Sequence, residues 1–79
     1  MQYDIVAVGK TIRSLRERKG LSQEVLSGLA GIARTHLSMI ENASKKANFE
    51  TLWRIALALD MRPSELVQKI EMEVETGAK

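Results

Sequence analysis

The chain of 79 residues is long enough for one small domain, and its hydrophobic fraction of 44% can fill a single core. It has no cysteine, which excludes disulfides and Cys-ligated metal sites. No apolar run approaches the roughly 20 residues of a membrane span, and Met1–Lys10 does not resemble a signal peptide, so we expect a cytoplasmic protein without membrane contact. The net charge is +2, but residues 1–54 carry nine basic against five acidic side chains. This distribution favours a polyanionic partner, although a mixed solvated surface would have the same composition.

Hydrophobic periodicity predicts two helices in the first part of the chain. The first has an apolar face made of Ile5, Val8, Ile12 and Leu15. It ends at Gly20, where a glycine takes the left-handed conformation at little cost. Ser22 is expected to cap the second helix, because its hydroxyl can accept a backbone N–H from the following turn. The expected apolar stripe of this helix consists of Leu26, Leu29 and Ala30, and Gly31 ends it.

Three further helices follow. The third begins near Arg34 and should turn Leu37 and Ile40 inward. After a polar loop, Asn48 can cap a fourth helix. The expected buried row of that helix consists of Leu52, Ile55, Ala56 and Leu59. Pro63 suits the first turn of a fifth helix. The apolar face of the fifth helix is expected to comprise Leu66, Val67 and Ile70. Residues 76–79 should fray. With no alternating β pattern, the sequence predicts one all-α domain over residues 1–79, a compact five-helix bundle.

The segment Ser22–Glu41 consists of a helix, a short glycine-containing turn and another helix, which is the outline of a helix-turn-helix. Any small helical bundle contains such pairs, so the polarity of the third helix carries more information. Its first turn and a half presents side chains that can hydrogen-bond base edges or phosphates, namely Arg34, Thr35, His36 and Ser38. A recognition helix enters the major groove with its N-terminal residues, so this pattern predicts DNA binding.

A set of residues in order along the chain resembles the phage repressor and Cro-type helix-turn-helix family, also called the Xre family. The resemblance covers about Gly9 to Leu66 and rests on Gly9, Ile12, Leu15-Arg16, Gly20-Leu21-Ser22-Gln23-Glu24, Leu26, Ala30-Gly31-Ile32, Leu37-Ser38, Ile40-Glu41, Leu52, Ile55-Ala56 and Ala58-Leu59. In size, and from Arg34 to Leu59, the chain is similar to controller proteins of restriction–modification systems. The implied fold is of the lambda-repressor-like DNA-binding type.

The resemblance implies a role for each matching position. Gln23 would contact a phosphate and brace the recognition helix. Arg34, Thr35, His36 and Ser38 would meet bases or nearby phosphates. Contacts of the following loop with the DNA backbone are implied for Asn42, Ser44, Lys45 and Lys46. Arg16 and Glu41 match a pair that forms an internal salt bridge in the family.

Three positions depart from the family pattern. Ala43 stands where a glycine usually follows the third helix, so we expect Asn42 or a different turn to take the reversal. Ala47 replaces a usual proline, and Phe49 replaces a usual aliphatic residue. The path of the loop, and with it the contacts of Lys45 and Lys46, depends on how these departures are accommodated.

The sequence contains no set of residues arranged for catalysis or for cofactor binding. It has no Ser/His/Asp arrangement, no glycine-rich phosphate loop and no metal-ligand cluster. His36 is the one histidine, and a lone histidine without cysteines is a poor metal ligand. We therefore expect no enzyme activity, no metal, no cofactor and, since no pocket-sized insertion is evident, no small-molecule effector.

A surplus of apolar residues in the last two helices predicts a homodimer. Trp53, Leu57 and Met61 form a second apolar row at i, i+4 and i+8, and Val67 and Ile70 add to it. A two-fold contact, made by helices over about residues 48–73, would bury this surface. Two alternatives stay open: Trp53 could belong to the core, and the fifth helix could fold back over the row within one chain.

Taken together, these features predict a homodimeric transcription regulator. It would bind double-stranded DNA at two-fold related half-sites in its own promoter region, as a controller protein of a restriction–modification system does. The alternative is an antitoxin-like helical subunit that acts mainly through a protein partner.

Overall fold

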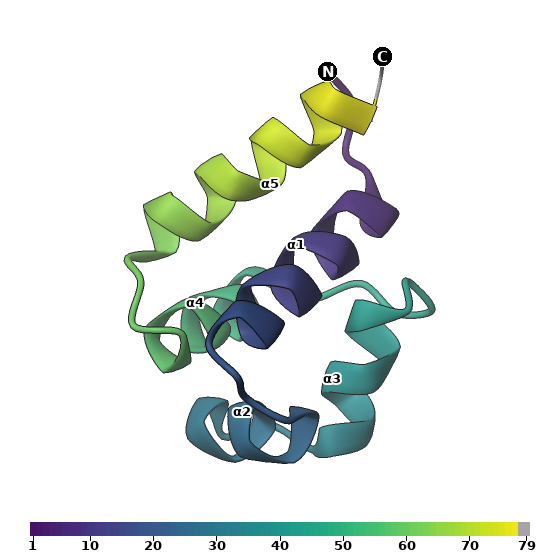
Figure 1. Cartoon of the computed structure of the whole chain (residues 1–79). Helices are drawn as coiled ribbons and strands as arrows, with labels where there is room; N and C mark the ends of the chain where they lie inside the picture. Colours follow the sequence, from purple (N-terminus) through teal and green to yellow (C-terminus); the bar gives the residue numbers. More distant parts are fainter. Residues whose placement is uncertain (78–79) are drawn as a thin grey trace.

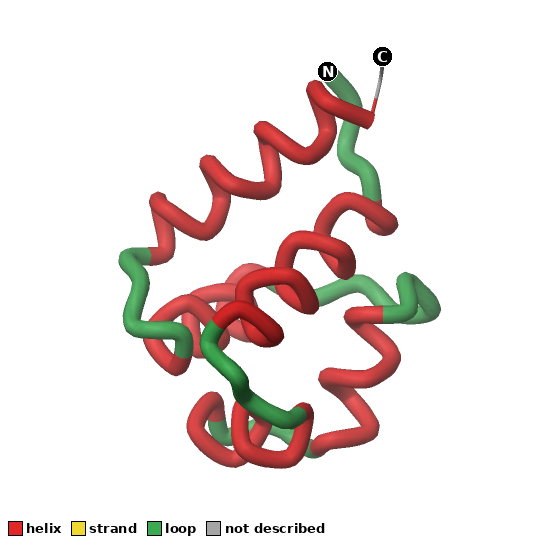
Figure 2. Tube along the Cα trace, viewed as in Figure 1, coloured by secondary structure: helices red, strands yellow, loops and turns green. Residues whose placement is uncertain are grey.

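Five helices joined by short turns make up residues 1–77, and side-chain caps or left-handed residues mark most of their ends. The computed structural model describes residues 1–77, and it has no strand in that range (Figures 1 and 2). The helices are α1 (Ile5–Arg18), α2 (Gln23–Ala30), α3 (Arg34–Glu41), α4 (Phe49–Ala58) and α5 (Pro63–Gly77). The all-α, five-helix architecture expected from the sequence is confirmed.

Side-chain oxygens cap three of these helices at their N-termini. Ser22 Oγ accepts from the Val25 amide at 3.1 Å, and Asn48 Oδ1 accepts from the Thr51 amide at 2.8 Å, as the sequence predicts for both caps. Asp4 caps α1 by accepting from two backbone amides. At the other end of α2, Gly31 takes a left-handed conformation with φ of +70°, which confirms it as the residue that ends the helix.

The helices pack in pairs that place α2 and α3 away from the chain termini. α1 packs against α3 and α5, α2 packs against α3 and α4, and α4 packs against α5. In Figure 1, α2 and α3 lie at the lower end of the molecule, whereas the two termini lie close together at the upper end. This arrangement exposes the helix-turn-helix segment as one end of the molecule.

Aliphatic side chains from all five helices form the core. The largest fully buried residues are Ile12, Leu26, Leu37, Ile40, Ile55, Leu59 and Leu66. Burying each such side chain contributes about 1.5–3 kcal/mol, so the core is the main source of stability in a chain with so few aromatic residues. The predicted inward positions on α3 and most of those on α1 and α4 are therefore confirmed, with Leu15 and Leu52 partly buried at the edge of the core. Ile5, at the start of α1, is half-buried and does not belong to the core.

Leu29 was expected in the buried stripe of α2, and this prediction is wrong, because 63% of its surface is exposed. The inward side of α2 consists of Leu26, Ala30 and Ser27 instead. Ser27 can be buried because its hydroxyl donates to the Glu24 carbonyl at 3.1 Å. This local hydrogen bond satisfies the Ser27 hydroxyl, so Ser27 can face the core while Leu29 faces outward.

The fifth helix also differs in detail from the expected pattern. Val67 lies at the edge of the apolar face and is 38% exposed, while Leu66 is fully buried and Ile70 packs against the core. Thr76 and Gly77 were expected to fray, but they belong to α5. Residues 78 and 79, for which the same was expected, lie outside the described residues. No helix within residues 1–77 is long and apolar enough to span a bilayer.

Candidate nucleic-acid interface

A tight turn joins α2 to α3 and sets the relative direction of the two helices. The Gly31 amide donates to the Gly28 carbonyl at 3.3 Å, and the Ile32 amide donates to the Ser27 carbonyl at 3.0 Å. Ile32 packs against the core directly after this reversal. The helix, turn and helix predicted over Ser22–Glu41 are thus present, and α2 and α3 contact each other.

α3 has one buried and one exposed side. Leu37, Ile40 and Glu41 are buried, whereas Arg34 and Thr35 are exposed and Ser38 is half-buried. Successive helical residues are separated by about 100°, so Arg34, Thr35 and Ser38 share one face. The structure therefore brings these three predicted residues together.

His36 does not share that face. It lies about 100° beyond Thr35 around the helix, towards the side of Ile40, and it is half-buried. Sequence reasoning grouped it with its neighbours because they are consecutive in the chain, whereas helical geometry places it on the flank of the exposed face. A contact of His36 with DNA would come from this flank.

Met39 is a residue on the exposed face that sequence reasoning missed. It is four residues after Thr35 and 41% exposed, and it lies next to Thr35 on the side away from Arg34. The i, i+4 spacing from Thr35 was the signal that could have identified it. A methionine in a helix is more often a core residue, so its residue type did not point to the exposed face.

The N-terminal end of α3 has no side-chain cap. Ala33 precedes the helix and its side chain has no hydrogen-bond acceptor, whereas α1, α2 and α4 are each preceded by a residue whose side chain accepts from the first amides. The first amides of α3 therefore point outward with no side-chain acceptor. Such amides, at the positive end of the helix dipole, suit the approach of a phosphate beside Arg34.

The loop after α3 turns through Ala43, which adopts φ of +65°. The expectation that Asn42 or a different turn would take the reversal is therefore wrong. Neighbouring contacts hold the alanine in this left-handed conformation: Asn42 Oδ1 accepts from the Ser44 amide at 3.0 Å, and the Met39 carbonyl accepts from the same amide at 2.9 Å. The chain thus keeps the turn that a glycine usually makes.

The same loop presents a cluster of exposed polar and basic side chains next to α3. These are Asn42, Ser44, Lys45 and Lys46. The Lys45 amide donates to the Met39 carbonyl at 3.2 Å, which ties the loop to the end of α3. The Lys46 ammonium lies 5.7 Å from the centroid of the Tyr3 ring, within the range of a cation–π contact. All four side chains are accessible beside the exposed face of α3.

A buried charge network fixes α3 against α1 and α2. Arg16 donates from Nε and Nη2 to the two carboxylate oxygens of Glu41, at 2.7 and 2.9 Å. Its Nη1 donates to the Leu21 carbonyl at 2.8 Å. The hydrogen bond to Glu41 raises the pKa of Arg16 above its ordinary value, against the lowering effect of burial, so Arg16 remains a cation. The internal salt bridge implied by the family resemblance is confirmed.

Gln23 joins the same network from the first turn of α2. Its Nε2 donates to Glu41 Oε1 at 3.0 Å, and the side chain is half-buried. Gln23 thus braces α3 through Glu41, as the resemblance implies. The phosphate contact implied for Gln23 would use the second N–H of the same Nε2 atom, because the amide oxygen and a phosphate are both acceptors.

α1 approaches α3 closely at Gly9. A Cβ atom built at this position would lie 2.6 Å from the carbonyl oxygens of Ile40 and Glu41. This is well below van der Waals contact, so a side chain at this position would push the two helices apart. Gly9 therefore allows the close packing that supports α3 from behind.

The residues predicted to form a dimer interface fall into two groups. Trp53 and Leu57 are 47% and 59% exposed, whereas Met61 and Ile70 are half-buried and pack against the core. Leu57 and Met61 line one groove at the α4–α5 turn, and Val67 and Ile70 line another with the N-terminal residues. Met61, at the end of the row, is thus partly covered, whereas Trp53 and Leu57 on α4 remain exposed. Trp53 lies on the surface and makes an edge-to-face contact with Phe49, at 5.9 Å between ring centroids.

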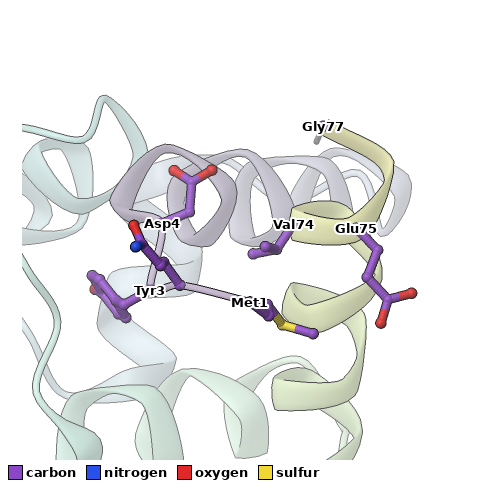
Figure 3. A pocket seen from close by; sticks show the side chains of 7 residues that line it. Met1, Tyr3, Asp4, Val74, Glu75 and Gly77 are labelled. Carbon is purple, nitrogen blue, oxygen red and sulfur yellow. The ribbon is translucent and has the colours of Figure 1, made fainter. Parts of the chain in front are cut away.

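A cavity lies at the other end of the molecule, between the N-terminal segment and the last turns of α5. It has a volume of about 430 Å³ and is lined by Met1, Gln2, Tyr3, Asp4, Val74, Glu75 and Gly77 (Figure 3). The Asp4 carboxylate is engaged in capping α1. Within residues 1–77, no group of His, Asp and Glu side chains is placed to hold a metal ion.

Comparisons with known proteins agree with this geometry. Residues 12–66 match the helix-turn-helix family HTH_3. The uncharacterized HTH-type transcriptional regulator y4dJ of Sinorhizobium fredii is 35% identical over 60 residues, which cover 76% of this chain and 78% of that protein. The restriction–modification controller protein C.AhdI of Aeromonas hydrophila is 38% identical, with a TM-score of 0.77 over 80% of this chain and 96% of that chain.

The fold is also that of the controller protein C.Esp1396I, crystallised as a tetramer in complex with its natural 35 base-pair operator. That structure is 24% identical and has a TM-score of 0.84 over 94% of this chain and 97% of that chain. The family match spans the whole α2–turn–α3 unit and its supporting helices, and these relatives are regulators and not enzymes. The chain belongs to the HTH_3 family of helix-turn-helix proteins and is a DNA-binding transcription regulator similar to restriction–modification controller proteins.

Proposed function

We propose that this protein is a homodimer that binds two symmetry-related half-sites in its own promoter region, as the controller of a restriction–modification system. The observation that carries the proposal is the exposed face of α3, where Arg34, Thr35 and Ser38 stand together on a helix held from behind by Glu41. A rigid helix with polar N-terminal side chains suits the major groove.

Each side chain of this face has a chemically defined partner in DNA. Arg34 can donate two hydrogen bonds to the O6 and N7 atoms of a guanine. Thr35 and Ser38 can hydrogen-bond neighbouring base edges, and His36 can reach a phosphate from its flank. Contacts with the DNA backbone are assigned to Gln23, Asn42, Ser44, Lys45 and Lys46.

The dimer would form through the last two helices, within about residues 48–73 of a single domain. Trp53 and Leu57 supply the exposed centre of the contact, and Met61, Val67 and Ile70 supply its partly buried edge. A two-fold contact covers the exposed part of this row and sets the spacing of two α3 helices. Because pairing depends on concentration, the switch responds to the amount of protein present in the cytoplasm.

Two features of relatives support the genetic role. C.AhdI is a controller protein and is 38% identical to this chain. C.Esp1396I, which has the same fold, assembles as a tetramer on a single natural operator. Autoregulation by a dimer, with a second dimer adding on a longer operator, is the corresponding expectation for this chain.

Footprinting on the DNA upstream of the protein's own gene tests the proposal. We expect protection of two half-sites about one helical turn apart, with dimers as the smallest species bound. The affinity should fall steeply as salt concentration rises, while the preference over unrelated DNA persists. Binding of unrelated DNA with equal affinity, or protection of one half-site by a monomer, would contradict the proposal.

A further inference from the structure

Met39 lies on the exposed side of α3, between Thr35 and His36 around the helix, two positions proposed to contact DNA. It is one helical turn after Thr35, it follows Ser38, and 41% of its surface is exposed. Its side chain is not among the residues that pack against the core. An apolar side chain at this position is therefore surrounded by polar groups and faces outward.

The position of Met39 is fixed by its backbone. Its carbonyl oxygen accepts from the Ser44 amide at 2.9 Å, from the Lys45 amide at 3.2 Å and from Ser44 Oγ at 3.3 Å. The residue is thus held where α3 ends and the polar loop begins. Only the thioether chain can adapt, with three rotatable bonds.

The chemistry of the major groove limits what such a side chain can contact. Base edges there present hydrogen-bond donors and acceptors, and the single apolar group among the four bases is the C5-methyl group of thymine. We propose that Met39 is a specificity-determining residue that packs against the methyl group of a thymine in each half-site. This inference rests on the proposed function, because it requires α3 to lie in the major groove.

Replacing a thymine by uracil tests this contact at the level of a single methyl group. Uracil lacks the C5-methyl group but keeps the hydrogen-bonding edges of thymine. The probe is a duplex selected from random sequence by the wild-type protein, with each thymine of a half-site replaced in turn. We expect one replacement to weaken binding of the wild type by about fourfold, the factor that corresponds to burial of one methyl or methylene group.

The variant Met39→Ala should bind the thymine and uracil versions of that site equally well. Met39→Leu should keep the preference for thymine. The matched control is Met72→Ala, which removes a methionine of 53% exposure from α5 and should respond to uracil like the wild type. If Met39→Ala does not melt cooperatively, Met39→Gln is used in its place. The same loss of the thymine preference is expected for that variant.

Two results would overturn the inference. In the first, no thymine in the half-site shows a uracil effect; in the second, Met39→Ala shows the same effect as the wild type. Both leave specific DNA binding intact and so leave the proposed function standing. Failure of the wild type to select any sequence is a different result, which refutes the proposed function and this inference together.

Discussion

Arg16 and Glu41 form a bidentate ion pair in which both side chains are almost fully buried, at 10% and 3% relative exposure. The pair joins α1 to the last residue of α3 and receives a further hydrogen bond from Gln23. The orientation of the exposed face of α3 therefore depends on charges placed behind it.

Removing the carboxylate should destabilise the fold strongly. Glu41→Ala leaves the buried Arg16 cation without its partner, and we expect a loss of about 3–5 kcal/mol in the free energy of unfolding. Urea denaturation followed by circular dichroism measures this change.

An exposed ion pair provides the matched control. Glu50 and Arg54 are also in contact, at 3.1 Å, but their side chains are 73% and 50% exposed. Glu50→Ala should therefore cost less than about 1 kcal/mol. Equal losses for the two variants would show that burial does not determine the strength of the Arg16–Glu41 pair.

A methyl group at Gly9 should destabilise the protein by forcing α1 away from α3. We expect Gly9→Ala to cost about 1–3 kcal/mol, because its Cβ would collide with backbone that cannot rotate away. Gly28→Ala is the control, since a Cβ in α2 meets open space and alanine favours the helix by about 0.8–1.0 kcal/mol. Thermal melting of both variants should show opposite shifts, and a common sign would disprove the steric account.

Ala43 in its left-handed conformation offers a stabilising substitution. The left-handed conformation costs an L-residue about 1–2 kcal/mol. Glycine avoids this cost but loses more conformational entropy on folding, so only part of the cost becomes a gain in stability. We expect Ala43→Gly to gain about 0.5–1 kcal/mol in denaturant titrations. By contrast, Ala58→Gly within α4 should destabilise the fold. A destabilised Ala43→Gly would argue against the positive φ angle in solution.

Arg34→Ala should abolish preference for the operator while leaving the fold intact. Loss of a bidentate contact to guanine corresponds to about 1–3 kcal/mol for each half-site. Lys69→Ala serves as the control, because it removes one positive charge from an exposed position on α5. Mobility-shift titrations should give a lower operator affinity for Arg34→Ala than for Lys69→Ala. Equal affinities would show that Arg34 does not contact the bases.

Leu57→Asp should produce a folded monomer that binds the operator weakly. Its side chain is 59% exposed, so the charge costs little within one chain but disfavours a two-fold contact. Val6→Asp, at 52% exposure on α1, introduces the same charge outside the proposed interface and should remain dimeric. Sedimentation over a concentration series measures both, and a monomeric wild type would refute the concentration-driven switch.

Features that depend on near neighbours in the chain could be predicted from the amino-acid sequence. The five helices follow from hydrophobic spacing, and the caps at Ser22 and Asn48 follow from side chains that reach amides three residues away. Pro63 at the start of α5 has the same local origin. These interactions form within a few residues, so their signals are complete in the sequence.

Which side of each helix is buried, and which contacts fix that side against the core, depends on the tertiary structure. Whether Leu29 or Ser27 faces inward depends on how α3 and α4 pack against α2, and α4 is distant from α2 in sequence. Contacts from the Met39 carbonyl and Asn42 keep Ala43 in a conformation that its own side chain disfavours. The face that presents Met39 likewise follows from the burial of Leu37 and Ile40, because a helix can turn only one side to the core.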